Sequence, residues 1–130
     1  MSGRLNKAKK FYSTTEKSSI KVQDPVSIVK TMVKELQSSM NKVIDSTGKE
    51  NERFVRTKYF SRSLVIIYTL QTTLDFDKGE KLATKLFQIY EYCRQQLIKC
   101  FKEQVVDGTY KAINALEDIF STNAVETNVT

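Results

Sequence analysis

The chain has 130 residues and a mass of 15.0 kDa, and 40% of its residues are hydrophobic, so we expect one domain with a single core. It contains no histidine, two cysteines, four glycines and one proline. This composition excludes histidine-dependent catalysis and histidine or four-cysteine zinc sites, and it argues against a glycine-rich phosphate loop and a turn-rich β protein. No apolar run reaches the roughly 18 residues that cross a bilayer, and no apolar segment follows the basic N-terminus as in a secretion signal. We therefore expect a soluble cytoplasmic protein that is not an enzyme, has no cofactor and does not enter a membrane.

The net charge of +6 is concentrated at the N-terminus. Residues 1–24 contain six lysine or arginine residues and two acidic ones, whereas residues 107–130 contain one basic residue and four acidic ones. Nucleic-acid-binding proteins instead gather basic residues on one face, often with interleaved aromatic residues. The sequence therefore favours a basic, solvated N-terminal arm. A basic helical bundle that binds nucleic acid or acts as an adaptor is the alternative.

Cys93 and Cys100 are seven residues apart within a helical pattern. Because a helix rises about 1.5 Å per residue, their Cα atoms are about 10 Å apart, too far for a disulfide. We expect two buried free thiols.

The first helix is expected to begin at Asp24-Pro25, with Asp24 as the N-cap and proline at the first helical position. Apolar residues then recur at three- and four-residue steps for about 20 residues, and Gly48 ends the pattern. The residues before this helix are too polar to pack, apart from Phe11, Tyr12 and Ile20. We therefore predict a mobile arm followed by an amphipathic helix.

The second helix is expected over residues 51–74. Its centre, from Leu64 to Tyr68, is apolar in every direction, which indicates a segment that is covered on several sides. The run is rich in β-branched residues, so a buried strand is the alternative interpretation. No turn residue interrupts the segment, and its length favours a helix because strands are shorter.

The third helix is expected to run from Asp77, its N-cap, to about Gln104, after a tight corner at residues 74–80. Asp75 and Asp77 flank this helix start, where acids cap rather than catalyse. Two neighbouring apolar stripes together span about 180° of the helix, more than the 100° or so that packing on one side requires. Either neighbouring helices cover both stripes, or one stripe meets a partner. The first stripe contains Leu82, Leu86, Ile89, Cys93, Leu97 and Cys100, and the second contains Ala83, Phe87, Tyr90, Ile98 and Phe101, with Arg94 among them.

A fourth, shorter helix is expected to open at Asp107-Gly108-Thr109, and residues 122–130 are polar and expected to fray. Short connections between long helices place consecutive helices antiparallel. We therefore predict an all-α protein, an antiparallel up-down bundle of four long helices over residues 25–121. A flexible basic arm at residues 1–24 precedes the bundle, and a tail at residues 122–130 follows it.

The corner and the third helix resemble a known pattern. The segment from Leu74 to Tyr92, LDFDKGEKLATKLFQIYEY, is similar to the "LDF-(D/E)-KGG-x-(I/L)-A-x-x-L-(Y/F)-x-(L/I)-Y-x-Y" segment of the flagellin-specific export chaperones of bacteria, the FliS family. The helix start from Asp24 to Val29 resembles the "S-P-x-x-L-I" start of that family. The resemblance covers roughly residues 12–120.

The N-terminal arm shows both agreement with the family pattern and departures from it. Tyr12 and Ile20 fall where the family has a tyrosine and a valine, but Thr15 replaces a second tyrosine. Elsewhere Glu80 replaces a glycine of the corner, and Phe120 stands near the usual tryptophan of the last helix. The resemblance implies that Tyr12 and Ile20 cover apolar bundle surface in the free protein.

The function that the resemblance implies is chaperoning of flagellin in the bacterial cytosol. Such proteins bind the disordered C-terminal segment of flagellin, which forms helices in apolar grooves on the bundle. They prevent premature polymerisation and present the subunit to the flagellar export gate. The expected partners are therefore flagellin and the export gate, with no nucleic acid and no membrane insertion, and the protein is expected to be a monomer or a weak homodimer.

The partner surface is expected on the second and third helices, where aromatic side chains contribute most because they bury much area at modest entropic cost. Arg94 is expected to contact a carboxylate or a carbonyl group of the incoming segment. The alternative is that these side chains are core. Asp75, Phe76 and Gly79 are expected to form the structural corner, where Gly79→Val costs stability if the φ of the glycine is positive. The predicted partner-binding residues are Leu64, Ile67, Tyr68, Ala83, Phe87, Tyr90, Arg94 and Phe101.

Overall fold

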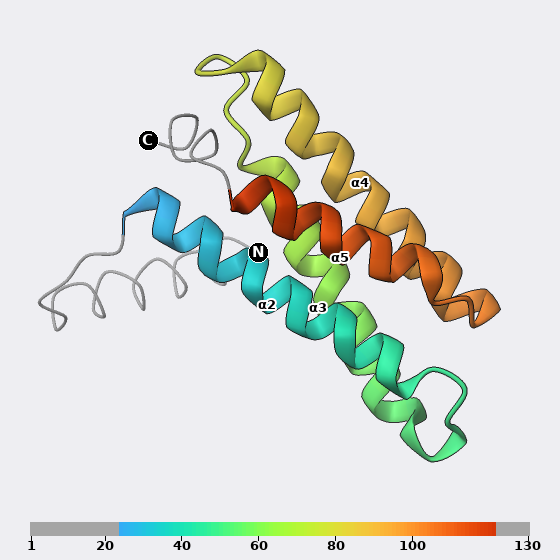
Figure 1. The fold of residues 1–130 in the computed structure, drawn as a ribbon. Helices are drawn as coiled ribbons and strands as arrows, with labels where there is room; N and C mark the ends of the chain where they lie inside the picture. The colour runs from blue at the N-terminus through green and yellow to red at the C-terminus, as the bar shows by residue number, and fades with distance from the viewer. Residues whose placement is uncertain (1–23, 122–130) are drawn as a thin grey trace, which may run out of the picture.

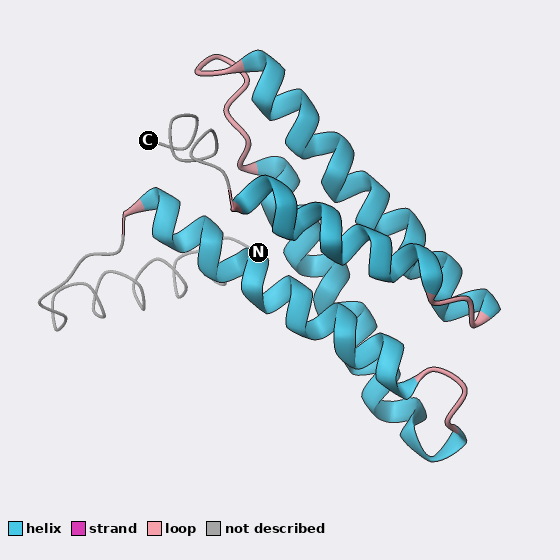
Figure 2. Cartoon of the chain, viewed as in Figure 1, coloured by secondary structure: helices cyan, strands magenta, loops and turns pink. Residues whose placement is uncertain are grey.

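The computed structural model describes residues 24–121, which form four long α-helices and one short 3-10 helix (Figures 1 and 2). The described residues contain no strand, so the prediction of an all-α bundle is confirmed. Residues 1–23 and 122–130, and with them Tyr12 and Ile20, lie outside the described part of the chain. The elements are α2 (Pro25–Ser46), η1 (Glu50–Glu52), α3 (Arg53–Thr72), α4 (Glu80–Glu103) and α5 (Asp107–Phe120).

The four helices are arranged around a common core, and consecutive helices run antiparallel (Figure 1). α3 packs between α2 and α4, and α5 packs against the same two helices from the other side. α3 and α5 are therefore opposite each other in the bundle. The side of α3 that faces away from α5 has no neighbouring helix among the described residues.

The start of α2 agrees with the sequence-based prediction. Asp24 is the N-cap, its Oδ1 accepts a hydrogen bond of 2.7 Å from the backbone N–H of Ser27, and Pro25 is in the first turn. This hydrogen bond favours the charged carboxylate and lowers the pKa of Asp24. The predicted capping arrangement is confirmed.

The apolar run at the centre of α3 is helical throughout, so the strand alternative is wrong. Ile67 and Leu70 are buried, at 0% and 2% exposure. Val65 and Tyr68 are 65% and 70% exposed on the outer side of the same helix. The expectation that this run is covered on several sides is therefore also wrong, because α3 has neighbours on its inner side only.

The corner between α3 and α4 is held by Asp75 rather than by Asp77. Asp75 Oδ1 accepts hydrogen bonds from the backbone N–H groups of Asp77 and Lys78, at 3.0 and 3.2 Å. α4 then begins at Glu80, with Gly79 at the N-cap position and no side-chain cap, so the predicted capping role of Asp77 is wrong. Gly79 has a φ of −174°, an extended conformation open to any residue, so the condition under which its substitution strains the backbone is not met.

The core is built from one apolar face of each long helix. Cys93 and Cys100 are buried free thiols within it, as predicted, and burial raises the pKa of Cys93 to about 12. The fully or nearly fully buried members are Val33, Leu36, Met40, Val43, Ile67, Leu70, Leu86, Tyr90, Cys93, Leu97, Cys100, Ala112, Leu116 and Ile119.

Two residues that end helices adopt the left-handed conformation, and they face each other. Gly48, after α2, has a φ of 79°, and Gln104, after α4, has a φ of 59°. A Cβ atom added at Gly48 would lie 4.0 Å from Gln104 Oε1, an ordinary contact distance. The two positions therefore differ mainly in whether the residue tolerates a positive φ.

We expect opposite changes in stability from substitutions at these two positions. Gly48→Ala should lower the free energy of unfolding by about 1–2 kcal/mol, the cost of a left-handed non-glycine residue. Gln104→Gly removes that cost but increases the conformational entropy of the unfolded chain, which offsets part of the gain. It should therefore raise the free energy of unfolding by about 0.5–1 kcal/mol. Urea unfolding of both variants measures these changes. Changes of the same sign would contradict the role assigned to the left-handed conformation.

Candidate functional site

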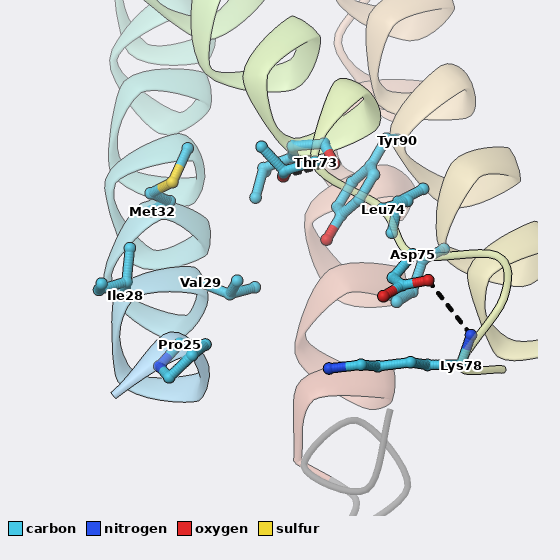
Figure 3. Close-up of a pocket in the computed structure, with 11 residues that line it drawn as sticks. Pro25, Ile28, Val29, Met32, Thr73, Leu74, Asp75, Lys78 and Tyr90 are labelled. Atoms are coloured by element: carbon cyan, nitrogen blue, oxygen red, sulfur yellow. Dashed lines mark hydrogen bonds between the residues drawn. The ribbon is translucent and has the colours of Figure 1, made fainter. Parts of the chain in front are cut away.

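An open pocket lies at the end of the bundle where α2 begins and the chain turns from α3 to α4 (Figure 3). Its volume is about 410 Å³, and most of its wall is apolar. The start of α2 forms one side, and the corner with α4 forms the other (Figure 3). The lining residues are Pro25, Ile28, Val29, Met32, Leu70, Thr73, Leu74, Asp75, Lys78, Leu86 and Tyr90.

Few polar groups reach this pocket. Tyr90 is 1% exposed, and burial raises the pKa of its phenol well above the usual range. Its hydroxyl points into the space between α2 and the corner (Figure 3). Asp75 and Lys78 add one acidic and one basic residue to the lining of the pocket. The Asp75 carboxylate accepts hydrogen bonds from two backbone N–H groups. Such a pocket suits an apolar side chain more than a charged ligand.

A second apolar surface follows the line of contact between α3 and α4, which we call the α3–α4 seam. The rings of Phe60 and Phe101 stack with centroids 4.1 Å apart and planes inclined by 11°. Toward the corner, Gln71 Nε2 donates to the backbone carbonyl of Phe87 at 3.5 Å and to Glu91 Oε1 at 3.3 Å. These contacts fix the antiparallel register of the two helices at two levels.

Five of the eight predicted partner-binding residues are at least partly exposed at the α3–α4 seam. Tyr68 is 70% exposed on α3, and Phe87 is 41% exposed on α4. Leu64, Arg94 and Phe101 are half-buried. Phe101 stacks on Phe60 across the seam, and Leu64 and Arg94 lie within about 40° of these two residues around their own helices.

The other three predicted residues, Ile67, Ala83 and Tyr90, are buried to 1% exposure or less and belong to the core. Ala83 and Tyr90 come from the second apolar stripe of α4, most of which is thus covered by neighbouring helices. Phe87 is the member of that stripe left exposed, because it lies at the outer edge of the contact with α3.

Arg94 is engaged with Glu91, one turn earlier on α4. Its Nη2 donates to Glu91 Oε2 at 2.6 Å, and its Nε donates to Glu91 Oε1 at 2.9 Å. This ion pair, aided by Gln71, lowers the pKa of Glu91 from 4.5 to about 2. The arginine side chain is still 43% exposed, so one side of it faces solvent.

The residues on the α2 side of the pocket were not predicted as site residues from the sequence. Ile28, Val29 and Met32 continue the apolar pattern of α2 and read as core. The difference in helix length could have indicated this pocket, because α2 has 22 residues and α5 has 14. A helix shorter by eight residues falls about 12 Å short of its neighbour and leaves part of that neighbour uncovered.

Residues 24–121 were also compared with the requirements of a metal site and of a membrane-spanning helix. They contain no group of three side chains placed to hold a metal ion. No helix in this part of the chain is long and apolar enough to span a bilayer.

The Glu91–Arg94 pair predicts a specific pH dependence. Because folding lowers the pKa of Glu91, its contribution to stability is complete above pH 4.5 and is lost as the pH falls toward 2. Glu91→Gln should therefore be less stable than the unmodified protein at pH 7, and the difference should shrink between pH 5 and pH 2. Urea midpoints across this range test it, with Glu103→Gln as the control for removing one negative charge from α4. A difference that is constant with pH would contradict the ion pair as its cause.

A comparison with protein families identifies the chain. The model of the family described as Flagellar protein FliS matches residues 8–124, which include all five described helices. Comparisons with curated proteins and with solved structures gave no match. Because the family match spans most of the chain and the fold is the expected helical bundle, this protein belongs to the FliS family of flagellar export chaperones, which is not a family of enzymes.

Proposed function

We propose that this protein is a cytoplasmic chaperone that binds the disordered C-terminal segment of flagellin, prevents its premature polymerisation and presents it to the flagellar export apparatus. Membership of the FliS family supports the general role in flagellar export. The observation that carries the finer proposal is the exposure of Tyr68 and Phe87, two large aromatic side chains on either side of the α3–α4 seam.

The seam offers what an amphipathic helix needs for docking. Leu64 and the stacked Phe60 and Phe101 are half-buried and provide an apolar base, while Tyr68 and Phe87 stand out from it. A disordered segment that folds on such a base buries its own apolar side chains and loses conformational entropy only on binding. Apolar residues spaced three and four positions apart, on one face of the bound helix, would contact these side chains.

Arg94 is placed to orient the incoming segment. Its exposed side can donate to a carboxylate or a backbone carbonyl while Glu91 holds the guanidinium in place. Ile67, Ala83 and Tyr90 have a different role in this proposal, because they are buried. They support the helices from within and do not contact flagellin in this arrangement.

Substitutions at the seam should separate binding from stability. Tyr68→Ala and Phe87→Ala should each weaken binding of a flagellin C-terminal peptide at least tenfold, about 1.4 kcal/mol, with a small change in melting temperature. Tyr90→Ala should instead lower the free energy of unfolding by about 3–5 kcal/mol, because it opens a cavity in the core. Fluorescence anisotropy and thermal unfolding give the two quantities.

Tyr110→Ala is the matched control, since Tyr110 is 46% exposed on α5, away from the seam. Equal losses of affinity in Tyr110→Ala and Tyr68→Ala would contradict the seam as the flagellin site.

We also propose that the N-terminal arm covers the pocket in the free protein through Ile20 and Tyr12. Pro25 lines the pocket, so the arm leaves the bundle at its edge. Ile20 is five residues earlier in the chain, and five extended residues span about 17 Å, so its side chain can return to the edge of the pocket at which Pro25 lies. The volume of about 410 Å³ accommodates an aliphatic or aromatic side chain from the arm.

Removing the apolar side chain of the arm should expose the pocket. Ile20→Ser should leave the bundle folded, raise the binding of an apolar-surface dye and speed the association of flagellin peptide, because the arm no longer competes. Leu5→Ser is the control, as it changes an apolar residue far from Pro25 in sequence. Unchanged dye binding, together with fast amide exchange at Ile20 in the free protein, would count against a covering arm.

A further inference from the structure

The outer side of α3 carries the most exposed large hydrophobic residues of the described chain. Phe54, Val65 and Tyr68 are 80%, 65% and 70% exposed. At about 100° per residue they fall within about 60° of one another around the helix axis. We call these three residues the outer ridge. Ser61 and Thr72, on the same line, are exposed polar residues, so Val65 and Tyr68 lie together while Phe54 is about 17 Å farther along the helix.

No element of the described chain covers the outer ridge. α3 is packed between α2 and α4, and α5 lies on the opposite side of the bundle (Figure 1). Phe54 and Val65 are also separate from the pocket, since neither lines it. An exposed apolar line along a helix is typical of a docking site for another helix.

The charges along α3 are all of one sign. The helix contains Arg53, Arg56, Lys58 and Arg62 and no acidic residue. Arg62 pairs with Glu35 of α2, and Arg56 donates to the backbone carbonyl groups of Ser46 and Lys49.

Lys58 lies beside the outer ridge and has no carboxylate partner among residues 24–121. Its Nζ is 5.4 Å from the centre of the Tyr59 ring, a weak contact that leaves the charge available. Arg53, which precedes Phe54, also forms no ion pair with a described acid. The outer ridge is therefore bordered by uncompensated positive charge.

The charge pattern selects among possible occupants. A second copy of the chain would bring the cations of one α3 against those of the other, and like charges disfavour that contact. The N-terminal arm, with six basic residues and two acidic ones, would be repelled in the same way. A partner with acidic residues beside its apolar face gains from both the ridge and the cations.

We propose that the outer ridge is a second docking surface, which takes an acidic amphipathic helix of a partner protein. The apolar side chains of that helix lie on Phe54, Val65 and Tyr68, and its aspartate or glutamate side chains face Lys58 and Arg53. This surface is distinct from the α3–α4 seam, with which it shares only Tyr68.

Two synthetic 20-residue helical peptides test this proposal on the full-length protein. They have the same leucine and alanine face, but the polar face carries glutamate in one and lysine in the other. The glutamate peptide should bind more tightly by at least tenfold in fluorescence anisotropy. The double variant Phe54→Ser, Val65→Ser should weaken that binding at least tenfold, and Lys58→Glu should weaken it while improving binding of the lysine peptide.

The variants also separate this surface from the flagellin site. Phe54→Ser, Val65→Ser should keep its melting temperature, since both side chains are mostly exposed, and should bind flagellin C-terminal peptide normally. Tyr110→Ser, on α5, is the control for losing an exposed apolar side chain. Loss of flagellin binding with unchanged binding of the glutamate peptide would overturn the proposal.

Three other results would overturn it. One is equal binding of the two peptides. Another is a concentration-dependent dimer in sedimentation that Phe54→Ser abolishes, which would make a second copy the occupant. The third is binding of a single-stranded oligonucleotide that depends on Phe54 and falls steeply with salt, which would assign the surface to nucleic acid.

Discussion

Each helix of a four-helix bundle packs against two neighbours, and α3 has more apolar surface than two neighbours can cover. Ile67 and Leu70 fill the core from its inner side, while Val65 and Tyr68 remain exposed on the other. Exposed apolar surface carries a free-energy cost of about 25 cal/mol per Å². A partner that covers it recovers that free energy, so the outer ridge and the α3 side of the α3–α4 seam both derive from this one property of α3.

The end of the bundle depends on a different constraint, the unequal length of its helices. α4 has 24 residues and α5 has 14, so the two span about 36 Å and about 21 Å. Asp75 fixes the corner by accepting hydrogen bonds from two backbone N–H groups, and this corner forms one wall of the pocket. The opposite wall is the start of α2, whose first turn is capped by Asp24, so side-chain hydrogen bonds to the backbone hold the segments that carry both walls.

The family match and the structure contribute different parts of the function. The match over residues 8–124 gives the role in flagellar export but does not say which side chains meet a partner. Exposure and packing then separate Tyr68 and Phe87, which are 70% and 41% exposed, from Tyr90, which is 1% exposed and lines the pocket. Tyr68 lies at the border between the α3–α4 seam and the outer ridge. Occupation of one surface therefore changes the area that the other can offer.

The helices, the cap of α2 by Asp24 and the buried free cysteines could be predicted from the amino-acid sequence, because they depend on local hydrogen bonding and on the period of apolar residues. The sequence did not separate Phe87 from Tyr90, since both are aromatic and lie on the same flank of α4. The packing of α3 against α4 makes the difference, because it leaves Phe87 41% exposed and Tyr90 1% exposed. Burial of a side chain depends on the position and rotation of the neighbouring helix, which no single helix encodes.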